Sequence, residues 1–128
     1  MSNVDNNKPY QLSYELRPEY LYVMIKGEKI DYEIARQYWN EIIEIREQAN
    51  TRFLLVDKNV QAELSTADEF QIAKELSTIA LKRVKLAICD RHVSQECLEF
   101  GEMVATNRGL NTKSFRDTAA AEKWLLAN

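Results

Sequence analysis

The sequence predicts an α/β domain built on a five-stranded, mostly parallel sheet with one antiparallel edge strand. Three observations support this prediction. Two strand-like segments open the chain, strand-like and helical segments then alternate to its end, and the inner strands read as short apolar runs. The predicted order is β-β-α-β-α-β-α-β-α, in which each strand-helix-strand connection makes a parallel pair and the opening hairpin makes the antiparallel one.

The opening hairpin comes from two segments on either side of a proline turn. Residues 10–17 alternate between apolar and polar side chains, as in a strand with one wet face. Arg17-Pro18-Glu19-Tyr20 is typical of a tight turn with proline at its second position. Residues 20–26 form a second β-rich run that ends at Gly27, so the two segments are expected to pair as antiparallel strands.

The first two helices are predicted from helical spacing and capping residues. Asp31 is the expected N-cap of a helix that runs to about Gln48, with apolar residues recurring along one face. Thr66 and Glu69 have the spacing of a capping box, which places the threonine at the N-cap of the second helix. The expected buried stripe of that helix is Phe70, Ala73, Leu76 and Ala80.

Two further helices complete the pattern. The third is expected to begin at Ser94 and to stop at Gly109. Asp117 or Thr118 is expected to cap a short last helix. The residues of the third helix that are expected to face inward are Cys97, Phe100, Met103 and Val104.

Two inner strands are predicted over residues 52–57 and 84–89, and a last strand over residues 110–115. If every crossover advances in one direction, right-handedness places the crossover helices on one face and the strand order follows the chain. The opposite face would then be open in a monomer, which motivates the hypothesis of a homodimer through that sheet face. Its residues are Ser13, Glu15 and Lys85 together with some of Tyr20, Tyr22, Met24, Ala87 and Cys89.

Composition and charge limit the function classes. The 128 residues include three glycines and two prolines, as expected for one domain, which we assign to residues 10–128 after a disordered tail over residues 1–9. A net charge of −3 gives no electrostatic reason to expect nucleic-acid binding. The longest apolar run is far shorter than the roughly 18 residues of a membrane-spanning helix, and residues 1–8 lack the features of a signal peptide. We therefore expect a cytoplasmic protein without membrane insertion.

Polar residues at strand ends are the candidate site. Asp57 closes one predicted parallel strand, and Asp90, Arg91 and His92 follow the next, so these four are expected to form an edge for a ligand or partner. Their spacing, even with Cys97, matches no zinc pattern. No nucleophilic serine on a glycine-flanked turn accompanies the histidine, and the three glycines lie far apart. We therefore expect no metal, no cofactor and no enzymatic activity.

Several segments together resemble a known family. They are the strand ending LLVD at Asp57, the helix that opens at Ser65-Thr66, the strand VKLAIC, and Phe115-Arg116-Asp117 before an alanine-rich helix with Trp124-Leu125. With the element order, they make the chain similar to STAS/SpoIIAA-like domains, and more narrowly to the bacterial single-domain branch known as STAS/SEC14-like. The resemblance covers the chain from Tyr10 onward.

The resemblance implies a non-enzymatic module that binds a protein partner and is switched by phosphorylation of a serine at the start of the second helix. Ser65 and Thr66 are the candidate phosphosites, and helix capping is their alternative role. The Asp-Ser-Ser-Gly segment of the family is replaced here by Glu63-Leu64-Ser65-Thr66-Ala67-Asp68. We expect a regulatory protein-interaction module that binds a partner or itself. The distant SEC14 relation implies an alternative, a carrier of a small apolar or lipid-like ligand.

Overall fold

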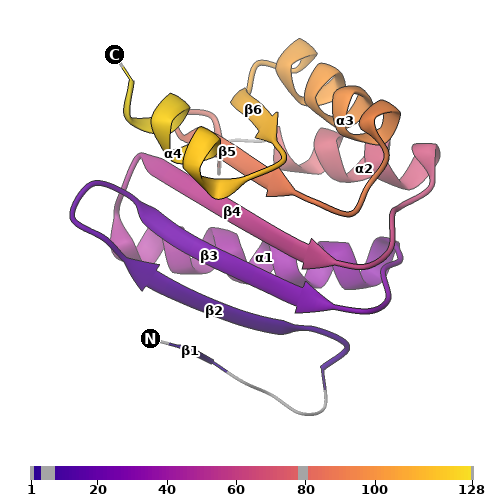
Figure 1. The fold of residues 1–128 in the computed structure, drawn as a ribbon, viewed down its shortest axis with the longest axis horizontal. Coiled ribbons are helices and arrows are strands. Elements are labelled where there is room, and N and C mark those ends of the chain that lie inside the picture. Colours follow the sequence, from indigo (N-terminus) through magenta and orange to yellow (C-terminus); the bar gives the residue numbers. More distant parts are fainter. Residues whose placement is uncertain (1, 4–7, 78–80, 128) are drawn as a thin grey trace.

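The computed structural model describes residues 2–3, 8–77 and 81–127 (Figure 1). Within these residues the chain forms one six-stranded sheet and four helices. The strands are β1 (Ser2–Asn3), β2 (Gln11–Leu16), β3 (Leu21–Gly27), β4 (Phe53–Val60), β5 (Lys85–Asp90) and β6 (Asn111–Phe115). The helices are α1 (Tyr32–Ala49), α2 (Thr66–Leu76), α3 (Gln95–Asn107) and α4 (Thr118–Leu126).

The sheet confirms the predicted fold class. The strand order follows the chain, β2 and β3 pair antiparallel, and β3 to β6 pair in parallel. One strand was not predicted. Ser2 and Asn3, within the segment expected to be a disordered tail, pair antiparallel with β2 as β1, while residues 4–7 lie outside the described chain. This strand is held by backbone hydrogen bonds to the edge of β2 rather than by buried side chains. Two polar residues carry no hydrophobic pattern, so the sequence gives no sign of it.

The two faces of the sheet carry separate hydrophobic clusters. Helices α1, α2 and α3 pack on one face, against alternate strand residues such as Leu54 and Leu86. Helix α4 packs on the other face, where Leu125 contacts the cluster of Leu55 and Ala87. Figure 1 shows α1 behind the sheet and α4 in front of it. The core is therefore divided into two layers by the sheet.

The prediction that the second face is open in a monomer is wrong for half of that face. Helix α4 follows the last strand, so no crossover connection holds it on the side of the other helices. It contacts β4, β5 and β6 and buries their apolar residues. None of the helices described lies in front of β2 and β3 (Figure 1). This region, here called the open half of the sheet, consists of Ser13, Glu15, Arg17, Tyr22, Met24 and Arg91.

Three of the four predicted helix starts are confirmed, and one is shifted by a residue. Asp31, Ser94 and Asp117 each accept a hydrogen bond from the third backbone amide that follows them. The second helix is capped by Ser65, whose side chain accepts from the amide of Asp68. The capping box predicted for Thr66 and Glu69 is therefore wrong, because the helix starts one residue earlier and the Glu69 side chain turns toward α3.

The buried faces of α2 and α3 differ in part from the predicted stripes. Ala73 and Leu76 are buried as expected, Phe70 is 41% exposed, and Ala80 lies outside the described residues. On α3, Val104 is buried as expected, but Met103 is 50% exposed. These two helices pack against each other as well as against the sheet. Which side chains of α2 and α3 are buried therefore depends also on the contact between the two helices, and the periodicity of one helix alone does not reveal that contact.

Candidate functional site

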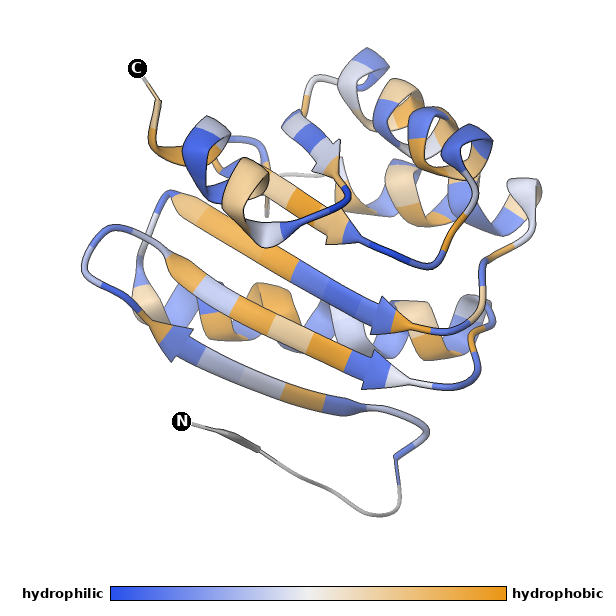
Figure 2. Ribbon diagram, in the orientation of Figure 1, coloured by the Kyte–Doolittle hydropathy of each residue, from blue (hydrophilic) through white to orange (hydrophobic). Residues whose placement is uncertain are grey.

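The carboxyl ends of β4 and β5 carry the predicted site residues. Strand β4 is hydrophobic over its first half and hydrophilic toward its carboxyl end (Figure 2). The parallel register pairs Asp57 with Cys89 and Lys58 with Asp90. Because successive side chains of a strand point to opposite faces, Asp57 lies on the α4 face and Asp90 on the face of α1 to α3. The residues that were expected to form one ligand or partner site at this edge therefore lie on opposite faces of the sheet.

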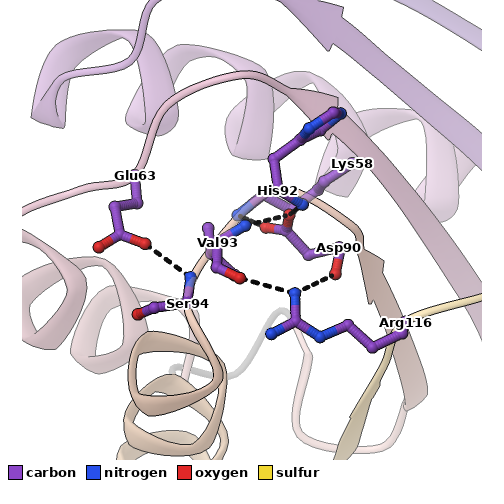
Figure 3. Close-up of polar contacts among 7 residues, drawn as sticks. All are labelled: Lys58, Glu63, Asp90, His92, Val93, Ser94 and Arg116. Atoms are coloured by element: carbon purple, nitrogen blue, oxygen red, sulfur yellow. Dashed lines mark hydrogen bonds and ion pairs between the residues drawn. The ribbon is translucent and has the colours of Figure 1, made fainter.

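Asp90 shapes the loop that enters α3. It is 3% exposed, and its Oδ1 accepts hydrogen bonds from the backbone amides of His92 at 3.1 Å and Val93 at 3.4 Å. The Arg116 guanidinium donates to the carbonyl oxygens of Val93, at 2.6 Å, and Asp90, at 3.4 Å (Figure 3). The remaining carboxylate oxygen, Oδ2, lies 3.5 Å from the ammonium group of Lys58. Asp90 therefore joins the loop to a buried cation.

Lys58 places that cation inside the protein. Its side chain is only 12% exposed and points to the face of the sheet covered by α1 to α3. Burial lowers the pKa of Lys58, but the neighbouring Tyr38, Asp90 and Glu69 side chains raise it by more. The net pKa is raised, so the ammonium group stays charged.

Glu69 extends the same cluster from α2. Burial raises the pKa of its carboxyl group, and the attraction of Lys58 opposes this increase. Its Oε1 lies 2.5 Å from the position that a Cβ atom would occupy on Gly101 of α3. The glycine thus leaves room for the carboxyl group between the two helices. This role of Glu69 was not predicted from the sequence. The available signal was Gly101 itself: a glycine inside a helix weakens the helix by roughly 1 kcal/mol, so its presence there points to a close contact that a larger side chain would block.

A cavity of about 60 Å³ lies between the sheet and helices α2 and α3. Its lining is mostly apolar, with a group of polar side chains. Two of these, the hydroxyl groups of Tyr38 and Thr112, are buried and have no hydrogen-bond partner among the described residues. The polar side chains of the lining include Tyr38, Lys58, Glu69, Asp90 and Thr112.

A second, more open hollow of about 310 Å³ lies at the start of α2 and α3. It shares Leu64, Glu69 and Cys97 with the cavity. Glu63 lies in this hollow and accepts a hydrogen bond of 2.8 Å from the amide of Ser94, so it adds to the capping of α3. Burial raises the pKa of Cys97 to about 11, which keeps its thiol protonated near neutral pH.

Asp57 forms a separate polar group on the α4 face. It is 5% exposed, and its Oδ2 accepts a 2.6 Å hydrogen bond from the hydroxyl of Tyr22 and lies 3.7 Å from Arg91. Burial and this hydrogen bond raise the pKa of Tyr22. The Arg17 guanidinium lies over the Tyr22 ring, 4.2 Å from its centroid. The pKa of the adjacent Cys89 thiol is raised to about 11, mainly by burial.

The other predicted site residues lie at the surface. His92 is exposed, and its ring Nε2 lies 2.6 Å from Asn59 Oδ1. Ser65 and Thr66 are exposed at the start of α2, where Ser65 Oγ accepts a 3.2 Å hydrogen bond from the amide of Asp68. The hydroxyl of Ser65 is thus engaged as a cap.

In the described part of the chain, no group of three or more His, Cys, Asp or Glu residues is arranged to hold a metal ion. Among the same residues, no helix combines the length and the apolar character needed to cross a membrane.

Comparison with known proteins identifies the fold. No family model and no curated protein matches the sequence. Among solved structures, the chain is similar to an uncharacterised protein of the DUF3478 family with a SpoIIAA-like fold, from Shewanella loihica PV-4. The two share 19% identity over 94% of this chain and 97% of the other, with a TM-score of 0.55. The chain therefore has a SpoIIAA-like fold, which confirms the predicted resemblance at the level of the fold.

Proposed function

We propose that this protein is a regulatory interaction module without catalytic chemistry, and that it binds a protein partner through the open half of the sheet. The observation that carries the proposal is the position of α4, which leaves β2 and β3 uncovered on that face. Tyr22 and Met24 are half-buried there. The Arg17 guanidinium lies over the Tyr22 ring, and Arg91 lies beside Asp57, the hydrogen-bond partner of Tyr22. Aromatic residues, methionine and arginine are the side chains most enriched at protein interfaces.

The polar network holds this surface in place before any partner binds. Arg17 donates to Glu15 at 2.7 Å and to the hydroxyl of Tyr20 at 2.6 Å, and that hydroxyl donates to Glu122 of α4 at 2.5 Å. Tyr22 is held by its hydrogen bond to Asp57. A surface whose side chains are already ordered loses less conformational entropy on binding, which favours association.

The electrostatics of the candidate reactive groups favour binding over catalysis. The raised pKa of Lys58 keeps it protonated, so it is a poor nucleophile. The pKa values of about 11 for Cys89 and Cys97 keep both thiols protonated as well. The alternative of an apolar-ligand carrier is also less well supported. The interior cavity of about 60 Å³ is small beside the roughly 300 Å³ or more of ligand pockets, and the adjoining hollow of about 310 Å³ is lined by the acidic residues Glu63, Glu69 and Glu96.

A pair of identical substitutions tests the proposed surface. Met24→Glu places a charge on the open half, and Met103→Glu places the same charge on an exposed position of α3. If the partner is a second copy, we expect concentration-dependent dimerisation in sedimentation equilibrium that Met24→Glu weakens at least tenfold and Met103→Glu leaves intact.

A photo-crosslinking side chain at position 24 or 103, used in cell extract, tests for a different partner. We expect the side chain at position 24 to crosslink to a defined surface of one protein, and the side chain at position 103 to give no such product. Tyr22→Glu, on the same face of β3, should abolish the crosslink from position 24. A monomeric protein whose two positions give the same crosslinks would refute the proposal.

A further inference from the structure

The cavity beneath α2 and α3 contains polar groups whose hydrogen-bonding capacity is incompletely satisfied. Tyr38 is fully buried and Thr112 is 7% exposed, and neither hydroxyl group makes a hydrogen bond of normal geometry with the described residues. The Tyr38 hydroxyl interacts electrostatically with Lys58, which leaves room for a further acceptor between them. The distance of 3.5 Å between Lys58 and Asp90 is longer than the roughly 2.7–2.9 Å of a charge-assisted hydrogen bond. Buried polar groups are almost always satisfied in folded proteins, so the cavity needs a polar occupant.

The volume limits the size of that occupant. A cavity of about 60 Å³ has room for about two water molecules at roughly 30 Å³ each, or for a molecule of about four non-hydrogen atoms. The apolar lining supplied by residues such as Ile72 and Leu86 favours a single compact molecule with a methyl group or a flat face. A lipid chain does not fit this space.

The charges on both sides of the cavity select a neutral molecule. Lys58 repels a cation from the floor of the cavity. Glu69 and Asp90 repel an anion, and the carboxylates of Glu63 and Glu96 line the hollow at the start of α2 and α3 through which it would enter. A neutral molecule with a carbonyl oxygen can accept from the ammonium group and the hydroxyls, and its N–H groups can donate to the Glu69 carboxyl group.

We propose that this cavity is a binding site for a small neutral carboxamide, a molecule of the size and chemistry of acetamide. Its carbonyl oxygen accepts from Lys58 and the Tyr38 hydroxyl, and its amide hydrogens face Glu69. Entry is through the hollow between the starts of α2 and α3, which shares Glu69 and Cys97 with the cavity. The site is on the opposite side of the sheet from the proposed interaction surface, so each can fail without the other.

Titration with one neutral, one anionic and one cationic probe, none of them larger than acetamide, tests the charge selection. Acetamide, acetate and methylammonium are added separately to ¹⁵N-labelled protein, and amide chemical shifts are followed. We expect acetamide to shift resonances of Lys58, Glu69 and Thr112, with an affinity at least tenfold higher than that of either charged probe. Equal or tighter binding of acetate or methylammonium, or shifts confined to other residues, would overturn the proposal.

Isosteric variants test the site itself. Tyr38→Phe and Thr112→Val each remove one hydroxyl group, and we expect Tyr38→Phe to weaken acetamide binding at least tenfold. Tyr14→Phe on β2, outside the cavity lining, is the matched control and should bind acetamide as the parent does. If the cavity holds only water or nothing, acetamide causes no shifts and removal of Tyr38's hydroxyl leaves the spectra with the probe unchanged; that result rejects the site.

Discussion

Lys58 on β4 and Asp90 on β5 are directly opposite in the parallel register, and their charged groups lie 3.5 Å apart beneath α2 and α3. One position earlier in each strand, Asp57 and Cys89 are also opposite each other but face α4. Two adjacent residue pairs of β4 and β5 therefore lie in two different environments, one on each face of the sheet. The buried ion pair belongs to the cavity, and Asp57 supports the open half of the sheet through Tyr22.

Removal of the Lys58 charge should strongly destabilise the fold. Lys58→Met leaves the Asp90 carboxylate buried without its cation, and we expect the free energy of unfolding to fall by about 3–5 kcal/mol. Urea unfolding measures this change. Lys82→Met removes an exposed lysine and should change stability by less than about 0.5 kcal/mol. Similar losses from both variants would contradict a special role for the buried pair.

The start of α2 can be tested by two neighbouring alanine substitutions. Ser65→Ala removes the side-chain acceptor for the amide of Asp68, so we expect a loss of about 1 kcal/mol in the free energy of unfolding. Thr66 is the first residue within the helix, and Thr66→Ala should have little effect or a slight stabilising one. Thermal or urea unfolding of both variants distinguishes the positions. A larger loss from Thr66→Ala would favour the capping box predicted from sequence.

The raised pKa of Glu69 should make the folded state less stable as the pH rises. Because the folded pKa exceeds the ordinary value of 4.5, the folded state binds more protons than the unfolded state between these two values. Stability from this group is therefore present at lower pH and is lost as the pH rises through the folded pKa.

Glu69→Gln removes this titration and gives the measurement. We expect the free energy of unfolding of the parent, relative to the variant, to decrease as the pH rises from about 4.5 to 7. Urea unfolding across that range compares the two proteins under the same conditions, so contributions from other acids largely cancel. A relative stability that increases with pH would show that the folded pKa of Glu69 is lowered rather than raised.

Cys97 should react slowly although it is only half-buried. A pKa of about 11 leaves a thiolate fraction at pH 8 that is about two orders of magnitude below that of an ordinary thiol of pKa about 8.5. We expect iodoacetamide to label Cys97 in the native protein far more slowly than in urea, as followed by peptide mass spectrometry. Equally rapid labelling in both states would contradict the buried, acid-surrounded environment of this thiol.

Much of the fold could be predicted because its signals are local. The alternation of residues 10–17, the apolar strand of residues 52–57 and the side-chain oxygens of Asp31, Ser94 and Asp117 each act within a few residues. Parallel crossovers then allow few topologies, so the strand order also followed from the sequence. The polar strand ends were visible by the same local reasoning.

The sequence by itself determined the order of the elements, the class of fold and the presence of polar residues at the ends of two parallel strands. Only the tertiary structure decided which of those residues meet. Adjacent strand positions point to opposite faces, so Asp57 and Lys58 are neighbours in the chain but lie in different environments. The contact of Glu69 with Gly101 and the packing of α4 over Leu55 join residues far apart in the chain, and such contacts depend on how helices pack rather than on local periodicity.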